Sequence, residues 1–293
     1  MNKITGILVF LIFLSSCETD IKVELKDPED VLVVDANIEN GRPPLVVLSK
    51  SLDFYGAIDP SVLLNSFVRN ADVTISNGVR THKLKEYATN AGNGITLYFY
   101  SIDSANLSTA FVGEFNKSYT LSIKTGGKDY VATTTIPALT KKIDSLWWKP
   151  APFNDDTTNV VVMVKVTDPP GYGNYIRYFT QRNKEPFLPG ENSVADDQVI
   201  DNTTYELQLD QGVNRNNPVD SDSNYFKRGD TVTLKLCNID KATYTFWSTW
   251  EFAFQSIGNP FAQPNKVIGN ISNGALGAFY GYAAGYTTLI IPR

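Results

Sequence analysis

Short runs of alternating apolar and polar residues, separated by tight-turn dipeptides, recur along most of this chain and constrain its fold most strongly. Asn40-Gly41, Asn77-Gly78 and Gly126-Gly127 each follow one such run and precede another. These dipeptides favour the positive φ angles of short β-hairpin turns. About seven strands of this kind are expected within residues 31–138, which predicts an immunoglobulin-like β-sandwich there. The expected strands are 31–38, 45–49, 71–76, a return strand ending near 84, 95–100, 118–124 and 130–136.

The remaining residues, 139–293, are expected to form a second β-rich domain. Residues 181–230 are long and polar, and a loop region of that length is uncommon in a compact domain unless it is functional. The uncharged, glycine-rich tail is interpreted as a loop leading into a final strand at 287–291. The other strands expected here are 143–148, 159–167, 175–180, 204–209 and 231–237.

One amphipathic helix is expected in this second domain, near residues 241–257. Asp240 is a suitable N-cap, because its carboxylate can accept hydrogen bonds from the first backbone N–H groups of a helix. Gly258-Asn259-Pro260 is a stop signal. Large apolar residues at helical spacing indicate a face that packs on a sheet, with a ligand-stacking platform as the alternative. These residues are Tyr244, Trp247, Trp250, Phe254 and Ile257.

The amino end has the form of a bacterial lipoprotein leader. Lys3 supplies a positive charge, and residues 4–14 form an apolar core of 11 residues, well short of the ~20 that span a bilayer. Leu14-Ser15-Ser16-Cys17 then matches a lipobox, which predicts removal of residues 1–16 and diacylation of the Cys17 thiol by palmitate-like chains. Two acyl chains hold a protein on a membrane durably. The alternative is an ordinary signal peptide with a chance cysteine. Residues 17–30 are polar and are expected to be a tether.

The composition argues against a nucleic-acid partner, against disorder and against a disulfide bond within the chain. The net charge is −5 and no basic run occurs, so a nucleic-acid partner is not expected. The aromatic content of 12% argues against disorder. With Cys17 lipidated, only Cys237 remains, which excludes an intrachain disulfide. Cys237 lies in an alternating run and is expected to be a small buried hydrophobe.

No catalytic residues are expected, and we predict that the protein is not an enzyme. His82 is the only histidine, which leaves no convincing Ser-His-Asp triad or histidine-rich zinc site, and it is expected on the surface of a hairpin strand. Paired carboxylates could support glycoside hydrolysis. The candidates are Asp155-Asp156, Asp196-Asp197 and Asp201. All lie in polar loops, which favours a solvated acidic surface.

One loop has the oxygen-ligand spacing of a calcium site. Asp220, Asp222 and Asn224 alternate as in the start of a calcium-binding loop. The pattern then departs from an EF-hand, because Tyr225 stands at the glycine position and Thr231 where a bidentate glutamate is needed. The alternative is a hydrated hairpin loop, and no other cofactor is expected.

Several segments in order resemble a known family. The lipobox is followed by Leu32-Val-Val-Asp-Ala-Asn-Ile38, Lys142-Ile-Asp-Ser-Leu146 and Asp168-Pro-Pro-Gly-Tyr-Gly-Asn-Tyr175, and later by Asn270-Ile-Ser-Asn-Gly-Ala-Leu-Gly-Ala-Phe279. Together they resemble lipoproteins of the domain of unknown function 4249 family, over nearly the whole mature chain. The resemblance implies a lipid-anchored protein of the Bacteroidota outer membrane that faces the cell exterior, often met beside TonB-dependent transporters. It implies no catalytic residues.

The expected function is therefore a non-catalytic binding or accessory module, with a TonB-dependent transporter in nutrient uptake as the partner. A surface hydrolase using paired carboxylates and a structural or adhesive envelope protein are the alternatives. Adjacent Trp147 and Trp148 should point to opposite faces of a strand. The outward ring is a candidate for stacking on sugars or apolar ligands, with plain packing as its alternative.

Overall fold

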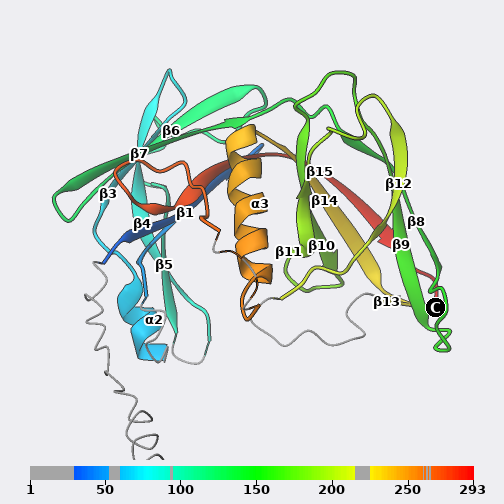
Figure 1. Cartoon of the computed structure of the whole chain (residues 1–293). Coiled ribbons are helices and arrows are strands. Elements are labelled where there is room, and N and C mark those ends of the chain that lie inside the picture. Colours follow the sequence, from blue (N-terminus) through cyan, green and yellow to red (C-terminus); the bar gives the residue numbers. More distant parts are fainter. Residues whose placement is uncertain are drawn as a thin grey trace, which may run out of the picture. The chain divides into compact units, whose positions relative to one another are not determined.

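The alternating runs in the sequence form strands throughout the part of the chain that the structure describes. This computed structural model describes residues 30–52, 60–92, 95–214, 225–259, 261, 263 and 265–293 (Figure 1). The prediction of a mainly β protein is confirmed. The first seven strands and a short helix are β1 Leu32–Glu39, β2 Leu45–Lys50, α2 Pro60–Ser66, β3 Asp72–Ser76, β4 Thr81–Asn90, β5 Thr96–Ile102, β6 Lys117–Thr125 and β7 Lys128–Ile136.

Most of the remaining strands match the expected ones, but β11 and β13 lie unexpectedly inside the long polar stretch, and β15 begins well before residue 287. The elements are β8 Lys142–Pro150, β9 Asn159–Thr167, β10 Tyr175–Arg182, β11 Leu188–Ala195, β12 Thr204–Leu209, β13 Phe226–Lys227, β14 Thr231–Ile239, α3 Lys241–Gln255 and β15 Leu276–Ile290. One sheet has the strand order β11-β10-β14-β15-β1-β2-β5-β4-β3-β6-β7. The other is centred on β9, which pairs with β8, β12 and β13.

The glycine-rich tail forms a long strand, so its interpretation as a loop is wrong. The first half of β15 pairs in parallel with β1, from Val33↔Leu276 to Glu39↔Tyr282. Its second half pairs with β14 in antiparallel fashion, and Figure 1 shows the red strand passing from blue β1 to yellow β14. A side chain at Gly277 would collide with the Val34 carbonyl, and one at Gly281 would stand 2.5 Å from the Thr135 carbonyl oxygen. Glycine here permits close packing of backbones.

Because β15 pairs with both β1 and β14, the two halves of the sequence share one sheet. Residues 31–293 group as one compact unit. The predicted boundary between a domain over 31–138 and a second over 139–293 stays a prediction, as does the immunoglobulin-like assignment of the first half.

Three clusters of buried side chains hold this unit together. The first lies among β1 to β7, where inward residues of β1 such as Val34, Ala36 and Ile38 are fully buried. The second fills the space between β9 and the β10–β14 pair and includes Val162 and Leu234. The third lies between α3 and the opposite face of β10, β14 and β15. Burial of each large aliphatic side chain contributes roughly 1.5–3 kcal/mol.

The predicted helix is confirmed as α3, although it ends at Gln255 and not at residue 257. The Asp240 carboxylate accepts a 2.8 Å hydrogen bond from the Thr243 backbone N–H, as expected of an N-cap. Phe246, which was not among the expected apolar residues, is the most deeply buried aromatic of the helix.

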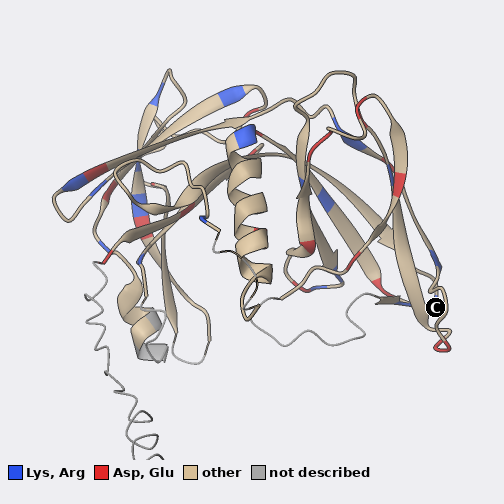
Figure 2. Ribbon diagram, in the orientation of Figure 1, with Lys and Arg blue, Asp and Glu red and all other residues tan. Residues whose placement is uncertain are grey.

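No helix among the described residues is long and apolar enough to cross a membrane. Figure 2 shows acidic and basic residues interspersed along the strands.

Candidate functional site

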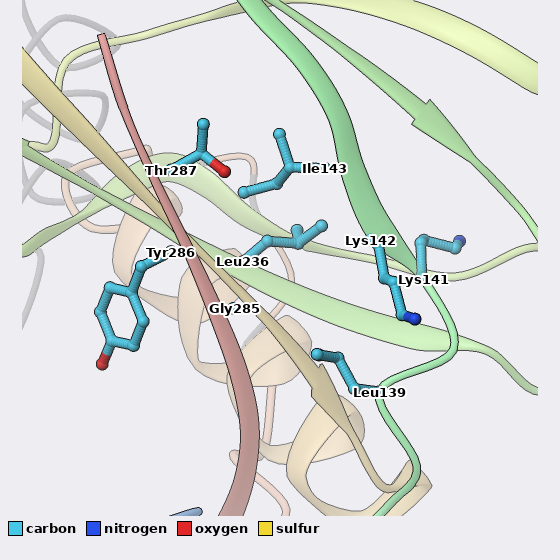
Figure 3. A pocket seen from close by; sticks show the side chains of 8 residues that line it. All are labelled: Leu139, Lys141, Lys142, Ile143, Leu236, Gly285, Tyr286 and Thr287. Atoms are coloured by element: carbon cyan, nitrogen blue, oxygen red, sulfur yellow. The ribbon is translucent and has the colours of Figure 1, made fainter.

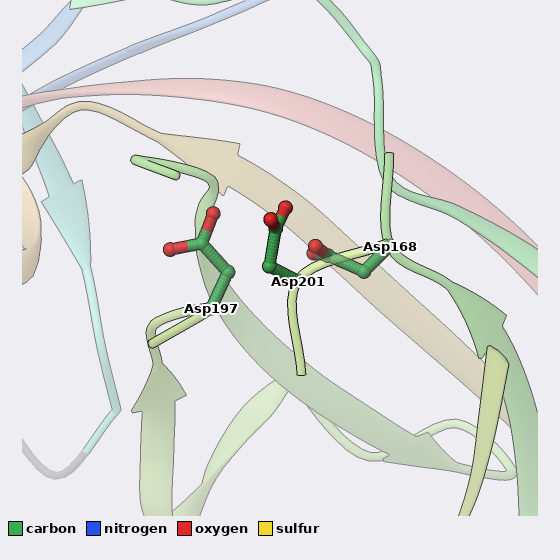
Figure 4. A group of neighbouring side chains, drawn as sticks. All are labelled: Asp168, Asp197 and Asp201. Atoms are coloured by element: carbon green, nitrogen blue, oxygen red, sulfur yellow. The ribbon is translucent and has the colours of Figure 1, made fainter. Parts of the chain in front are cut away.

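Three aspartates converge beside the loop that follows β9. Asp168 comes directly after β9, whereas Asp197 and Asp201 lie between β11 and β12. One carboxylate oxygen from each lies within 4.8 Å of the others, and Figure 4 shows the Asp201 carboxylate between the other two. Asp168 and Asp197 are only 1% and 2% exposed. The sequence pattern had singled out Asp197 and Asp201 as candidate carboxylates, and the structure adds Asp168.

A buried lysine neutralises one of these carboxylates. The Lys141 ammonium forms an ion pair with Asp168, and both side chains are fully shielded from solvent. Asn238 holds the Lys141 backbone in place: its side chain accepts from the Lys141 N–H at 2.9 Å and donates to the Lys141 carbonyl at 2.8 Å. Removing two charges from water costs several kcal/mol each. The ion pair offsets part of that cost, and the Asn202 backbone N–H donates to the other Asp168 oxygen at 3.3 Å.

The other two aspartates hold the glycine-rich loop 168–174. Asp197 accepts hydrogen bonds from the backbone N–H groups of Gly173 at 3.1 Å and Asn174 at 2.8 Å. Asp201 accepts from the Gly171 N–H at 2.7 Å. Burial alone would raise the pKa of the Asp197 carboxyl, but the hydrogen bonds from Asn174 and Gly173 outweigh it and the net shift is downward. Asp197 is therefore ionised at neutral pH.

The geometry of these carboxylates matches a structural clamp better than a catalytic or metal centre. A general acid needs a raised pKa, and that of Asp197 is lowered. Three carboxylate oxygens at this spacing could hold a hard cation. However, the Lys141 ammonium already stands against Asp168, and backbone N–H groups occupy lone pairs of Asp197 and Asp201.

A second buried polar network lies under α3. The Glu251 carboxylate accepts from the Ser193 backbone N–H at 3.0 Å. The Ser193 hydroxyl in turn accepts from Arg177 Nε at 3.1 Å, and Arg177 Nη1 donates to the Tyr282 hydroxyl at 2.8 Å. The Arg177 guanidinium also stacks 3.3 Å from the centre of the Trp247 ring. Glu251, Ser193, Arg177 and Tyr282 are linked in this way, so the network stabilises the packing of α3 on the sheet.

An open apolar groove lies on the solvent-facing side of β4 and β5. Its volume is about 460 Å³. The rings of Tyr87 and Phe99 stack in its floor with centroids 5.7 Å apart. Leu107 and Val112, from the loop between β5 and β6, form one wall and remain 64% and 41% exposed. The full lining is Pro43, Tyr87, Phe99, Ser101, Ile102, Ser104, Leu107 and Val112.

His82 anchors the loop that forms this wall. The prediction of a surface position is wrong: His82 lies on the same buried face of β4 as Leu84 and is only 1% exposed. The Asp103 backbone N–H donates to Nε2 at 3.0 Å, so in the neutral ring Nδ1 carries the proton and donates to the Thr109 hydroxyl at 2.9 Å. Burial lowers the pKa of His82. The neutral imidazole therefore joins β4 to the loop.

A smaller cavity of about 170 Å³ lies where β8 meets β14 and β15 (Figure 3). Leu139, Ile143 and Leu236 supply its apolar lining, and Lys141 and Lys142 lie at one side. The Lys141 ammonium forms its ion pair with Asp168, so it is not free to bind a ligand in this cavity.

The predicted tryptophan pair is only partly available to a ligand. Both rings are half-buried on β8. Trp148 packs against the second core cluster, and the Arg228 guanidinium lies 4.7 Å from its ring centre. Trp147 is not part of that cluster, and Lys149 Nζ lies 5.7 Å from its ring centre.

Two other predicted sites lie outside the described residues. These are the lipidation site Cys17 and the calcium-loop residues Asp220, Asp222 and Asn224. Cys237, by contrast, is described and is a free, buried thiol, as expected.

Comparison with known proteins returns one family. A family model described as a domain of unknown function, DUF4249, matches residues 18–288. No curated protein matches the chain.

Proposed function

The chain belongs to the DUF4249 family, and from this premise we propose that it is a lipid-anchored lipoprotein of the outer membrane that acts as a non-catalytic binding or accessory module. In this proposal the folded residues face the cell exterior. The partner is a TonB-dependent transporter, and the role is in nutrient uptake.

The observation that carries the proposal is the lipobox. Leu14-Ser15-Ser16-Cys17 follows a positive residue and a short apolar core, the arrangement of a leader that ends at a lipidated cysteine. Diacylation of Cys17 would fasten the chain to the membrane surface. Residues 18–30 would then separate the lipid from β1.

The geometry of the described residues supports binding in preference to catalysis. The clustered carboxylates of Asp168 and Asp197 are buried and committed to Lys141 and to backbone N–H groups. The apolar groove beside Tyr87 and Phe99, in contrast, is open and of a size that accommodates a small ligand.

Chemical cross-linking on intact cells, followed by capture of a tagged protein from outer membranes, tests the proposal. Wild-type protein should recover an envelope transporter, and Cys17→Ala should recover much less, because it is no longer held at the membrane. Recovery of no envelope protein by the wild type, or equal recovery by Cys17→Ala, contradicts the proposed role.

A further inference from the structure

We propose that the apolar groove on β4 and β5 binds the alkyl chain of an anionic amphiphile, such as a long-chain fatty acid, and that Lys85 receives its carboxylate. This inference gives a ligand class to the binding role proposed above and rests on that role. It does not depend on the lipid at Cys17.

The groove has the size and surface of a hydrocarbon site. Its volume of about 460 Å³ falls within the range of small-molecule pockets. The stacked rings of Tyr87 and Phe99 form a flat apolar floor. Leu107 and Val112 are exposed although they are large and apolar, so an occupant would remove apolar surface from water on both sides.

Two hydroxyl groups of the lining, on Tyr87 and Ser101, are already engaged, which favours a hydrocarbon over a sugar or a peptide. The Tyr87 hydroxyl already donates to the Ile102 carbonyl at 2.8 Å, and the Ser101 hydroxyl donates to the Pro44 carbonyl at 2.7 Å. A sugar or peptide would lose hydrogen bonds to water without gaining these donors, which costs free energy. An alkyl chain carries no such penalty.

A cation stands at the edge of the groove. Lys85 is the cross-strand partner of Ser101, which lines the groove. Its ammonium lies 5.7 Å from the centre of the Tyr87 ring. The side chain is 51% exposed, and its nearest carboxylate oxygen, on Asp103, is 3.9 Å away. This loose pairing leaves the ammonium able to receive a ligand carboxylate.

The wall of the groove is held in place before a ligand arrives. His82 bonds to the Asp103 backbone and to the Thr109 side chain. Arg80 Nη1 donates to the Ala110 carbonyl at 3.1 Å. A wall that is already ordered reduces the entropy cost of binding.

Calorimetric titration of the purified full chain carrying Cys17→Ala tests this inference, because that variant has no acyl chains of its own to compete. The titrants are octanoate, decanoate and dodecanoate, each below its critical micelle concentration. Affinity should rise about two- to fourfold per added methylene. Dodecyltrimethylammonium should bind about two- to fivefold more weakly than dodecanoate, and Lys85→Gln should remove that difference.

Two further substitutions locate the site. Leu107→Glu places a negative charge in the groove, where it repels the ligand carboxylate, and should abolish binding, whereas Val199→Glu, at a position 93% exposed outside the groove, should leave it unchanged. Both positions are exposed, so both variants should fold, as unfolding curves would verify. Affinity independent of chain length, or equal loss in both variants, overturns the inference. Failure to capture a transporter would count against the proposed function while leaving this titration unaffected.

Discussion

Replacement of Lys141 by methionine should be among the most destabilising single changes at the aspartate cluster. Methionine keeps the apolar stem but removes the ammonium that pairs with Asp168. Both side chains are fully shielded from solvent, so the Asp168 carboxyl group would be left buried without a counter-ion. Breaking a buried pair in this way costs about 3–5 kcal/mol.

Thermal unfolding followed by circular dichroism measures this effect. For a protein of this size each kcal/mol lowers Tm by about 2–4 °C, so Lys141→Met should lower it by about 6–20 °C. The adjacent Lys142→Met is the matched control. Lys142 is exposed, and surface substitutions usually change stability by less than about 0.5 kcal/mol.

A double variant separates loss of the pair from loss of packing. Adding Asp168→Asn to Lys141→Met removes the orphaned charge, so the double variant should be more stable than Lys141→Met alone. If Lys141→Met is as stable as Lys142→Met, or if Asp168→Asn makes Lys141→Met worse, the buried pair does not have the role assigned to it.

Three further predictions concern other buried groups. Glu251→Ala should cost about 1–3 kcal/mol in urea unfolding, because the buried Ser193 N–H loses its acceptor; a smaller loss would mean that water replaces the carboxylate. Burial lowers the pKa of His82 in the folded protein below its ordinary value of 6.5. Well above pH 6.5 the ring is neutral in both states, and its full contribution to the free energy of unfolding is present. As the pH falls, the unfolded chain takes up the proton more readily than the folded protein, and this contribution is lost. Between about pH 7.5 and 5, the free energy of unfolding should fall more for the wild type than for His82→Gln. If the free energies of unfolding of the two proteins change in parallel with pH, this prediction is refuted. Burial raises the pKa of the Cys237 thiol to about 12, so iodoacetamide should modify it only after unfolding, and rapid labelling of native protein would contradict its buried placement.

Patterns within short segments of the sequence predicted the helix and most strands, because those elements are specified by residues close together in the chain. The N-cap at Asp240 and the 3.6-residue spacing after it predicted α3, and alternation predicted most strands. The parallel pairing of β15 with β1 joins residues more than 240 positions apart, and no local pattern encodes that pairing. The glycines of β15 resembled a loop because the close backbone contacts that require glycine at 277 and 281 arise only in the folded sheet.

The candidate sites likewise combine residues that the sequence could identify with long-range contacts that it could not. Asp197 and Asp201 were recognisable as acidic residues, but their convergence with Asp168 and Lys141 depends on how three separate segments meet. His82 was expected on the surface because it is polar, although the alternation on β4 places it on the same buried face as Leu84. The signal that was available for this site is the run Asp168-Pro-Pro-Gly-Tyr-Gly-Asn174, whose glycines 171 and 173 adopt positive φ angles.

Metabolic labelling with an alkyne fatty acid tests the central claim most directly. Wild-type protein should carry the probe and sediment with outer membranes, whereas Cys17→Ala should be unlabelled and should be released from them. An unlabelled wild-type protein, or a Cys17→Ala variant that stays firmly in the membrane fraction, would contradict the lipid anchor from which the proposed function follows.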